Sequence, residues 1–203
     1  MRLRPTNREI EVKLRVTDLP AMLRRLRRLA KLSRGRVFEQ NTLYDTRDSA
    51  IRRAGYLLRL RLITPAPASK PRCAPIGAIL TVKAPIALSA KTPRGRYKER
   101  LERETIVRDP RRWNARMRAL GLLPSFCYEK YRTTFRLPHL NLDLDETPVG
   151  VFLELEGKPA AIDRAARALG FAPRDYIRGT YWDVYAADCR RRGWPIENMV
   201  FTS

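Results

Sequence analysis

The sequence predicts an α+β fold in which short strands surround a charged lumen. Three observations predict it. Apolar and polar residues alternate with a period of two in many short segments, which is typical of strands with two unlike faces. The polar positions are nearly all charged, and they sort by sign from one segment to the next. Helical patterns interrupt these segments, so helices and strands share one fold.

Composition and charge limit the class of protein. The chain has 203 residues, of which 44% are hydrophobic and 31% charged, as in soluble globular proteins. With no domain boundary or internal repeat, we expect one domain over residues 1–203. Apolar runs are short, and no apolar segment follows the basic N-terminus, so we expect a cytoplasmic protein without a signal peptide or membrane span. A net charge of +21 favours anionic partners.

Cysteine and histidine are scarce, which excludes several kinds of site. Cys73, Cys127 and Cys189 form no CxxC pair, so a zinc site or disulfide framework is not expected. His139 is the only histidine in the sequence and lies in an expected turn, which argues against Ser-His or Cys-His catalysis. No P-loop or GxGxxG pattern occurs either. If the chain binds phosphate, side chains must do so.

The strands that carry this alternation have charged faces. In the first, Glu9, Glu11 and Lys13 share one face, and the aliphatic residues between them share the other. A sheet with its polar face in water is the alternative, but such a face needs no sorting of charge by sign. We therefore favour a lumen that faces a metal and a polyanion. Strands are expected at 9–16, 57–63, 79–83, 100–105, 130–137, 142–145 and 151–156.

Helices are expected between the strands. Thr17 or Asp18 can cap a helix with an apolar stripe from Leu19 to Leu29, and Asp109 can cap another. The first helix carries a basic face, which we interpret as solvated rather than as a nucleic-acid surface. Proline-rich loops are expected at 64–77 and 85–96. The expected helices are 19–29, 48–54, 110–120, 159–169 and one between 173 and 192.

An ordered set of motifs resembles one family. Glu9-Ile-Glu11-Val-Lys13 resembles the ExExK signature of the CYTH family, the triphosphate tunnel metalloenzymes, which include class IV adenylyl cyclases, thiamine triphosphatases and inorganic triphosphatases. The resemblance implies an eight-stranded antiparallel β-barrel with flanking helices, whose tunnel binds a triphosphate and one or two divalent metals. Arg178 stands where the family has a lysine before a Ser-Tyr pair, so its place in the tunnel is open. Further matching blocks are 43–46, 52–61, 81–83, 100–104, 130–132, 142–145 and 150–157.

The candidate site residues follow from the alternation and the resemblance. Carboxylates two apart on a strand project to one side and offer hard oxygen ligands for Mg²⁺ or Mn²⁺. Glu102 and Glu104 are expected to pair with tunnel cations and rank below the other acids as ligands. The expected metal ligands are Glu9, Glu11, Asp145, Glu154 and Glu156. Phosphate binding is assigned to Lys13, Arg59, Arg61, Lys83, Arg100, Lys130, Arg132 and Arg136, and catalysis to Glu9, Glu11, Lys13 and Lys83.

Three functions are compatible with this site. We favour metal-dependent hydrolysis of inorganic triphosphate, thiamine triphosphate or a nucleoside triphosphate, because it needs only the phosphate clamp. A class IV adenylyl cyclase also needs a base pocket, which the sequence does not identify. A non-catalytic binder of polyphosphate or RNA gains nothing from the carboxylates. The expected partner is a small molecule with a triphosphate; nucleic acid is not favoured, and a homodimer is compatible with the sequence.

Overall fold

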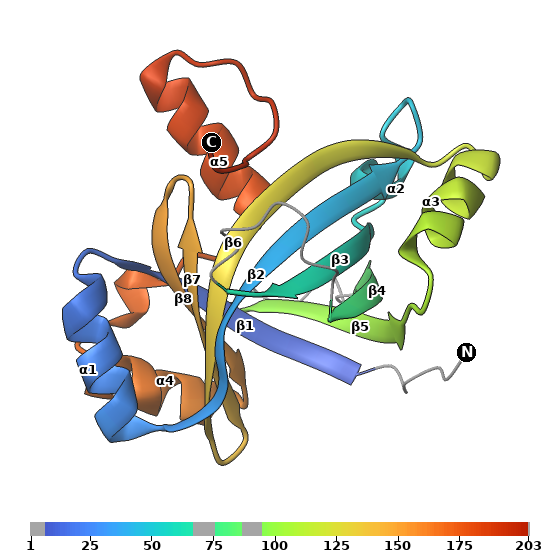
Figure 1. Cartoon of the computed structure of the whole chain (residues 1–203). Helices are drawn as coiled ribbons and strands as arrows, with labels where there is room; N and C mark the ends of the chain where they lie inside the picture. The colour runs from blue at the N-terminus through green and yellow to red at the C-terminus, as the bar shows by residue number, and fades with distance from the viewer. Residues whose placement is uncertain (1–6, 67–75, 87–94, 203) are drawn as a thin grey trace.

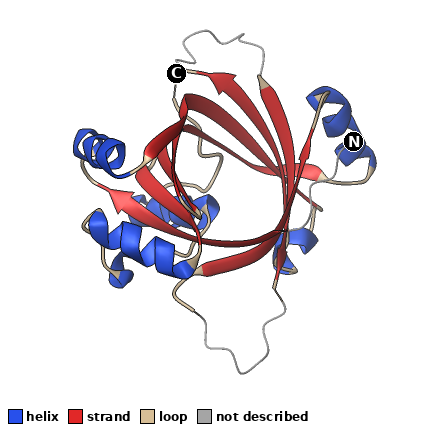
Figure 2. Ribbon diagram, turned by 90° about the horizontal axis from the view of Figure 1, so that it is seen from below, coloured by secondary structure: helices blue, strands red, loops and turns tan. Residues whose placement is uncertain are grey.

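The protein is a closed antiparallel β-barrel of eight strands, in the order β1-β5-β4-β3-β2-β6-β7-β8. The computed structural model describes residues 7–66, 76–86 and 95–202, so the middle parts of both expected loops lie outside the described residues. Figure 2 shows the strands as a ring with helices outside it. The α+β barrel expected from the sequence is confirmed. The strands are β1 (Asn7–Val16), β2 (Lys31–Asp45), β3 (Leu57–Pro65), β4 (Gly77–Pro85), β5 (Lys98–Ile106), β6 (Leu123–Leu137), β7 (Leu140–Thr147) and β8 (Gly150–Gly157).

The helices begin where the sequence places their caps. The Asp18 carboxylate accepts a hydrogen bond from the backbone N–H of Ala21 at 2.8 Å. Asp109 does the same for Arg112 at 3.0 Å, and each cap satisfies a donor that the first helical turn leaves unpaired. The helices are α1 (Leu19–Leu29), α2 (Ala50–Arg53), α3 (Pro110–Ala119), α4 (Pro159–Ala168) and α5 (Tyr181–Arg192), with a 3₁₀ turn at Pro173–Asp175.

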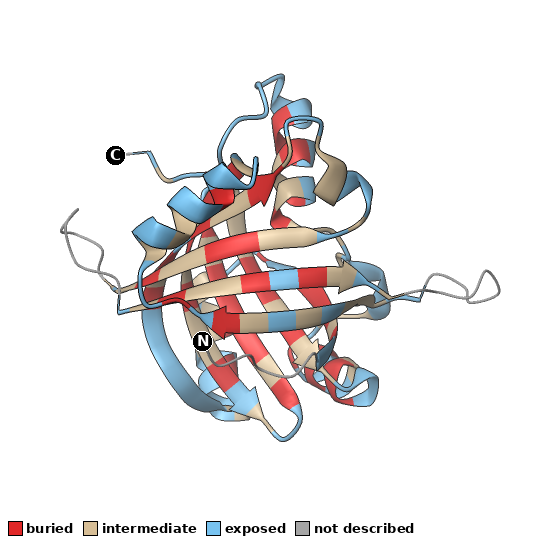
Figure 3. Ribbon diagram, turned by 90° about the vertical axis from the view of Figure 1, so that its right-hand side faces the viewer, coloured by how far each residue is buried: buried red, intermediate tan, exposed pale blue. Residues whose placement is uncertain are grey.

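The main apolar core lies outside the barrel. α1 and α4 lie side by side against one wall of strands (Figure 1), and Leu26 and Ile162 from these helices are fully buried against Leu14, Leu142 and Leu155. Each buried aliphatic side chain of this size contributes about 1.5–3 kcal/mol to folding. Figure 3 shows buried bands alternating with more exposed ones along the strands. The strands thus turn apolar residues outward under helices and charged residues inward.

Strand β2 was not expected from the sequence. It pairs with both β3 and β6, and its pairing with β6 shifts register between Leu32 and Arg34, between Arg34 and Val37, and between Leu43 and Tyr44. Between these shifts the register is regular, but consecutive residues such as Glu39 and Gln40 place polar side chains on both faces. The segment 31–45 therefore lacks the alternation of apolar and polar residues that identified the other strands.

Helix α5 closes one side of the barrel. Tyr181, at its first turn, is buried against Phe152 of β8 and Tyr128 of β6. Met199 from the following segment bridges to Tyr128, which ties the C-terminal part of the chain to β6. In the part of the chain that the structure describes, no helix has the length and apolar character needed to cross a bilayer.

Candidate active site in the barrel

A cavity of about 350 Å³ lies inside the barrel and is lined by charged side chains from its strands. Most of the residues that the sequence assigned to the site line it. Arg100 lies instead on an adjoining cavity, and Asp145 is fully buried behind the lining. The assigned residues on the lining are Glu9, Glu11, Lys13, Arg59, Arg61, Lys83, Lys130, Arg132, Arg136, Glu154 and Glu156.

Three carboxylates gather where β1 lies between β5 and β8. Glu9, Glu102 and Glu156 each place one carboxylate oxygen within 4.8 Å of the others. Burial, with the repulsion of Glu9 next, raises the pKa of Glu156 to about 8. Burial also raises the pKa of Glu9, although Lys83 opposes this shift. Buried oxygens that repel one another in this way fit a hard divalent cation.

Lys83 lies beside this cluster. Its ammonium group is 2.6 Å from one carboxylate oxygen of Glu9 and 3.3 Å from Glu102. Burial lowers the pKa of Lys83, but the charges of Glu9 and Glu11 outweigh it, so the net shift is upward. Lys83 is therefore a fixed positive charge at the edge of the cluster.

Glu11 and Glu154 are both paired with Lys13. The Lys13 ammonium group lies 3.2 Å from Glu11 and 2.9 Å from Glu154, and Lys98 also donates to Glu11. Burial raises the pKa of Glu11, but the charges of Lys13 and Lys98 lower it by more than burial raises it. The net pKa is well below its ordinary value. Both carboxylates are thus ionised and matched by lysines, and their role as metal ligands stays a prediction.

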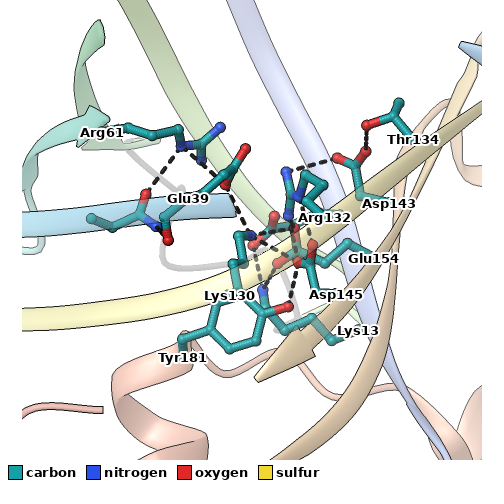
Figure 4. Close-up of polar contacts among 12 residues, drawn as sticks. Lys13, Glu39, Arg61, Lys130, Arg132, Thr134, Asp143, Asp145, Glu154 and Tyr181 are labelled. Atoms are coloured by element: carbon teal, nitrogen blue, oxygen red, sulfur yellow. Dashed lines mark hydrogen bonds and ion pairs between the residues drawn. The ribbon is translucent and has the colours of Figure 1, made fainter. Parts of the chain in front are cut away.

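Asp145 is held by three donors (Figure 4). It accepts hydrogen bonds from Lys130 at 2.8 Å, from the Arg132 Nε at 2.6 Å and from the Tyr181 hydroxyl at 2.6 Å. Arg132 also pairs with Asp143 at 2.8 Å. Asp145 therefore has a positioning role toward Lys130 and Arg132, and the metal binding expected of it stays a prediction.

Glu39 is a site residue that the sequence analysis missed. It lies on β2, fully buried, 3.3 Å from the Arg61 Nε and 3.7 Å from the Lys130 ammonium group (Figure 4). Neither of its carboxylate oxygens has a hydrogen-bond partner of good geometry among the described residues. Burial raises its pKa, but Arg61 and Arg132 dominate and leave it at about 2. An ionised acid thus lies among the arginine and lysine side chains on this side of the cavity.

The cavity-lining arginines expected to bind phosphate lie on β3 and β6, the two strands that flank β2. Arg59 donates to the Tyr128 hydroxyl and to the Thr81 hydroxyl, both at 3.1 Å, so its guanidinium is held in place. Arg136 lines the cavity but is exposed at its rim. Arg178 is exposed and donates to the carbonyl of Gly95 at 2.8 Å, which directs it away from the lining.

The match to a known family agrees with this geometry. The CYTH domain matches residues 7–181. The chain belongs to the CYTH family. This family is in general enzymatic and metal-dependent. The sequence has no significant match among curated proteins.

Solved structures of low sequence identity share the CYTH fold. A putative adenylate cyclase from Vibrio parahaemolyticus has a TM-score of 0.69 and 19% identity, over 90% of this chain and 99% of that chain. The PH1819 protein from Pyrococcus horikoshii has a TM-score of 0.70 and 20% identity, over 89% and 99%. A putative adenylyl cyclase from Hippeastrum, with a dominant triphosphatase activity, has a TM-score of 0.52 and 18% identity, over 92% and 97%.

Proposed function

We propose that the protein hydrolyses a triphosphate inside its barrel with the help of Mg²⁺ or Mn²⁺. The observation that carries this proposal is that one cavity holds both a cluster of carboxylates and many lysine and arginine side chains. Glu9, Glu102 and Glu156 form an acidic cluster at one place, and the lysine and arginine wall lies beside it. A pure anion binder would lose affinity by keeping such carboxylates in its site.

The acidic cluster supplies the ligands for the metal. Carboxylate oxygens on three adjacent strands suit Mg²⁺ or Mn²⁺, which prefer oxygen donors. When bound there, the metal would polarise a phosphate oxygen and make a coordinated water more acidic. Glu102 joins Glu9 and Glu156 in this proposal because strand pairing brings it to them.

The cationic wall holds the substrate. Arginine guanidinium groups bind phosphate oxygens in pairs, and lysines act as point charges. Arg59, Arg61 and Arg132 would orient the triphosphate, while Lys13 and Lys83 offset charge as it builds on the leaving oxygen. Water forms a bond to the terminal phosphorus, and the bridging P–O bond breaks with its electron pair on the leaving diphosphate or nucleoside diphosphate. The water protons pass to solvent or to the phosphate products.

Cyclisation is the second candidate function. In that reaction the ribose 3′-hydroxyl attacks the α-phosphorus, and pyrophosphate leaves. The similarity to structures described as putative adenylate cyclases supports it only at the level of the fold. The Hippeastrum protein, a putative adenylyl cyclase with a dominant triphosphatase activity, supports hydrolysis as an activity that this fold can carry.

Product identification tests the proposal. The protein is incubated with inorganic triphosphate or ATP and with Mg²⁺ or Mn²⁺, and the products are separated. Orthophosphate supports hydrolysis, whereas cyclic AMP with pyrophosphate replaces the proposal by the cyclase. A protein that converts none of the triphosphates contradicts both.

A further inference from the structure

A second cavity of about 660 Å³ adjoins the tunnel. The two cavities share four lining residues, so single side chains border both of them. Strand β3 begins at this junction, where Leu57 pairs with Lys83 of β4. A molecule in the second cavity therefore lies next to the charges of the tunnel, with Leu57 at the border. The shared residues are Leu57, Tyr128, Thr180 and Tyr181.

The wall of this cavity is aromatic and aliphatic. Trp182 from α5 and Phe126 from β6 contribute to it, and Tyr56 and Ile51 approach from the segment around α2. The Arg52 guanidinium lies 4.4 Å from the centre of the Trp182 ring. Tyr56 is 47% exposed, so its ring is available to a ligand. Aromatic faces of this kind stack on planar rings.

The charged residues of the cavity come in equal numbers of the two signs. Arg52 and Arg100 both line it. Its acids are engaged: Asp45 accepts from the backbone N–H groups of Ile51 at 2.9 Å and Arg52 at 3.1 Å. Asp183 accepts from the backbone N–H of Thr180, the N-cap residue of α5, at 2.7 Å. The two arginines and the two aspartates balance in formal charge, so the cavity suits a neutral base.

We propose that this cavity binds the nucleoside of a nucleoside triphosphate. The base stacks beside Trp182 and Tyr56, and the triphosphate enters the tunnel past Leu57. This inference rests on the proposed function, because it names the class of substrate for the same site. Inorganic triphosphate would leave the second cavity unfilled, and thiamine triphosphate would bring a positive ring toward Arg52 and Arg100.

Two variants and a matched control test the proposal. We expect Trp182→Ala and Tyr56→Ala each to raise the KM for ATP about tenfold, because stacking on one aromatic ring is worth about that factor. The KM for inorganic triphosphate should not change. Trp194→Ala is the control: Trp194 is 57% exposed, and its ring lies 4.8 Å from the Arg192 guanidinium, but it does not line the cavity. It should leave both KM values unchanged.

Binding of a nucleotide that cannot be hydrolysed tests the nucleoside cavity independently of the proposed hydrolysis. Titration calorimetry with β,γ-methylene ATP and Mg²⁺ measures the nucleoside contribution directly, whichever triphosphate is hydrolysed. Tighter binding of this analogue than of inorganic triphosphate, lost in Trp182→Ala and Tyr56→Ala, supports the proposal even if no substrate turns over. Equal binding of the two, or KM values for both substrates that change together in both variants, overturns it. Trp182→Phe, which keeps a stacking face, should recover most of the affinity.

Discussion

Replacing Glu156 by glutamine should make the metal-free protein more stable. In the folded protein the pKa of the Glu156 carboxyl is about 8, against an ordinary value of 4.5, first because of burial and then because of Glu9. A carboxyl whose folded pKa is raised contributes stability at low pH that is lost as the pH rises toward that pKa. Wild-type stability should therefore fall between about pH 4.5 and pH 8. Glutamine does not titrate and removes this loss.

The size of the effect follows from the two pKa values. At pH 7 the unfolded carboxyl is ionised, while the folded one with its pKa of about 8 remains mainly protonated. The distance of about 2.5 pH units between pH 7 and the ordinary pKa of 4.5 corresponds to about 3 kcal/mol in the free energy of unfolding. For a domain of this size, that gain raises the melting temperature by about 10 °C. Near pH 5 the gain shrinks to about 1 kcal/mol.

The assay is thermal and urea unfolding of the metal-free protein at pH 5 and pH 7. Glu146→Gln is the matched control, since Glu146 pairs at the surface with the Arg36 Nε at 2.7 Å. Losing that pair should cost at most about 1 kcal/mol and should not stabilise. Mg²⁺ should raise the melting temperature of the wild type and not of Glu156→Gln. A variant with wild-type stability at both pH values would refute the account of the acidic cluster.

Three further predictions concern activity and the buried charges. Glu11→Gln should abolish hydrolysis and keep the circular dichroism spectrum of the wild type; full activity would remove Glu11 from the site. Asp145→Asn should destabilise the protein by about 3–5 kcal/mol, measured by urea unfolding, because Lys130 and Arg132 lose a buried counter-charge; an unchanged midpoint argues against the positioning role. Removing divalent metal with a chelator should stop hydrolysis, and Mg²⁺ or Mn²⁺ should restore it. Turnover that persists in excess chelator contradicts the metal requirement.

The strands with clean alternation were predictable from the sequence. Glu9, Glu11 and Lys13 alternate on β1 and Glu154 and Glu156 on β8, and the barrel turns these side chains inward. Helices α1 and α3 were predictable because their caps, Asp18 and Asp109, are local signals. β2 was not, because polar residues lie on both faces of its regular stretch, and Glu39 was missed with it.

The acidic cluster depended on information that the sequence does not carry locally. Glu9 and Glu156 were expected as ligands, but Glu102 was ranked below them because it was expected to pair with cations of the tunnel. Its place is set by the pairing of β1 with β5, where Asn7 lies opposite Glu102, and by the pairing of β1 with β8. These contacts join residues far apart in the chain. Alternation gives the face of each side chain, whereas strand register decides which carboxylates meet.

The separation of the apolar core from the charged lumen has a consequence for function. Leu26 and Ile162 pack outside the barrel, whereas Glu9 and Glu156 lie inside it. The core can therefore support a lumen whose charges repel one another when no metal is bound. Selection for metal and phosphate binding then acts on side chains that folding does not need, and some of them, such as Glu156, oppose folding. A neutral substitution at Glu156, unlike one at Asp145, should thus lower activity while the barrel stays intact.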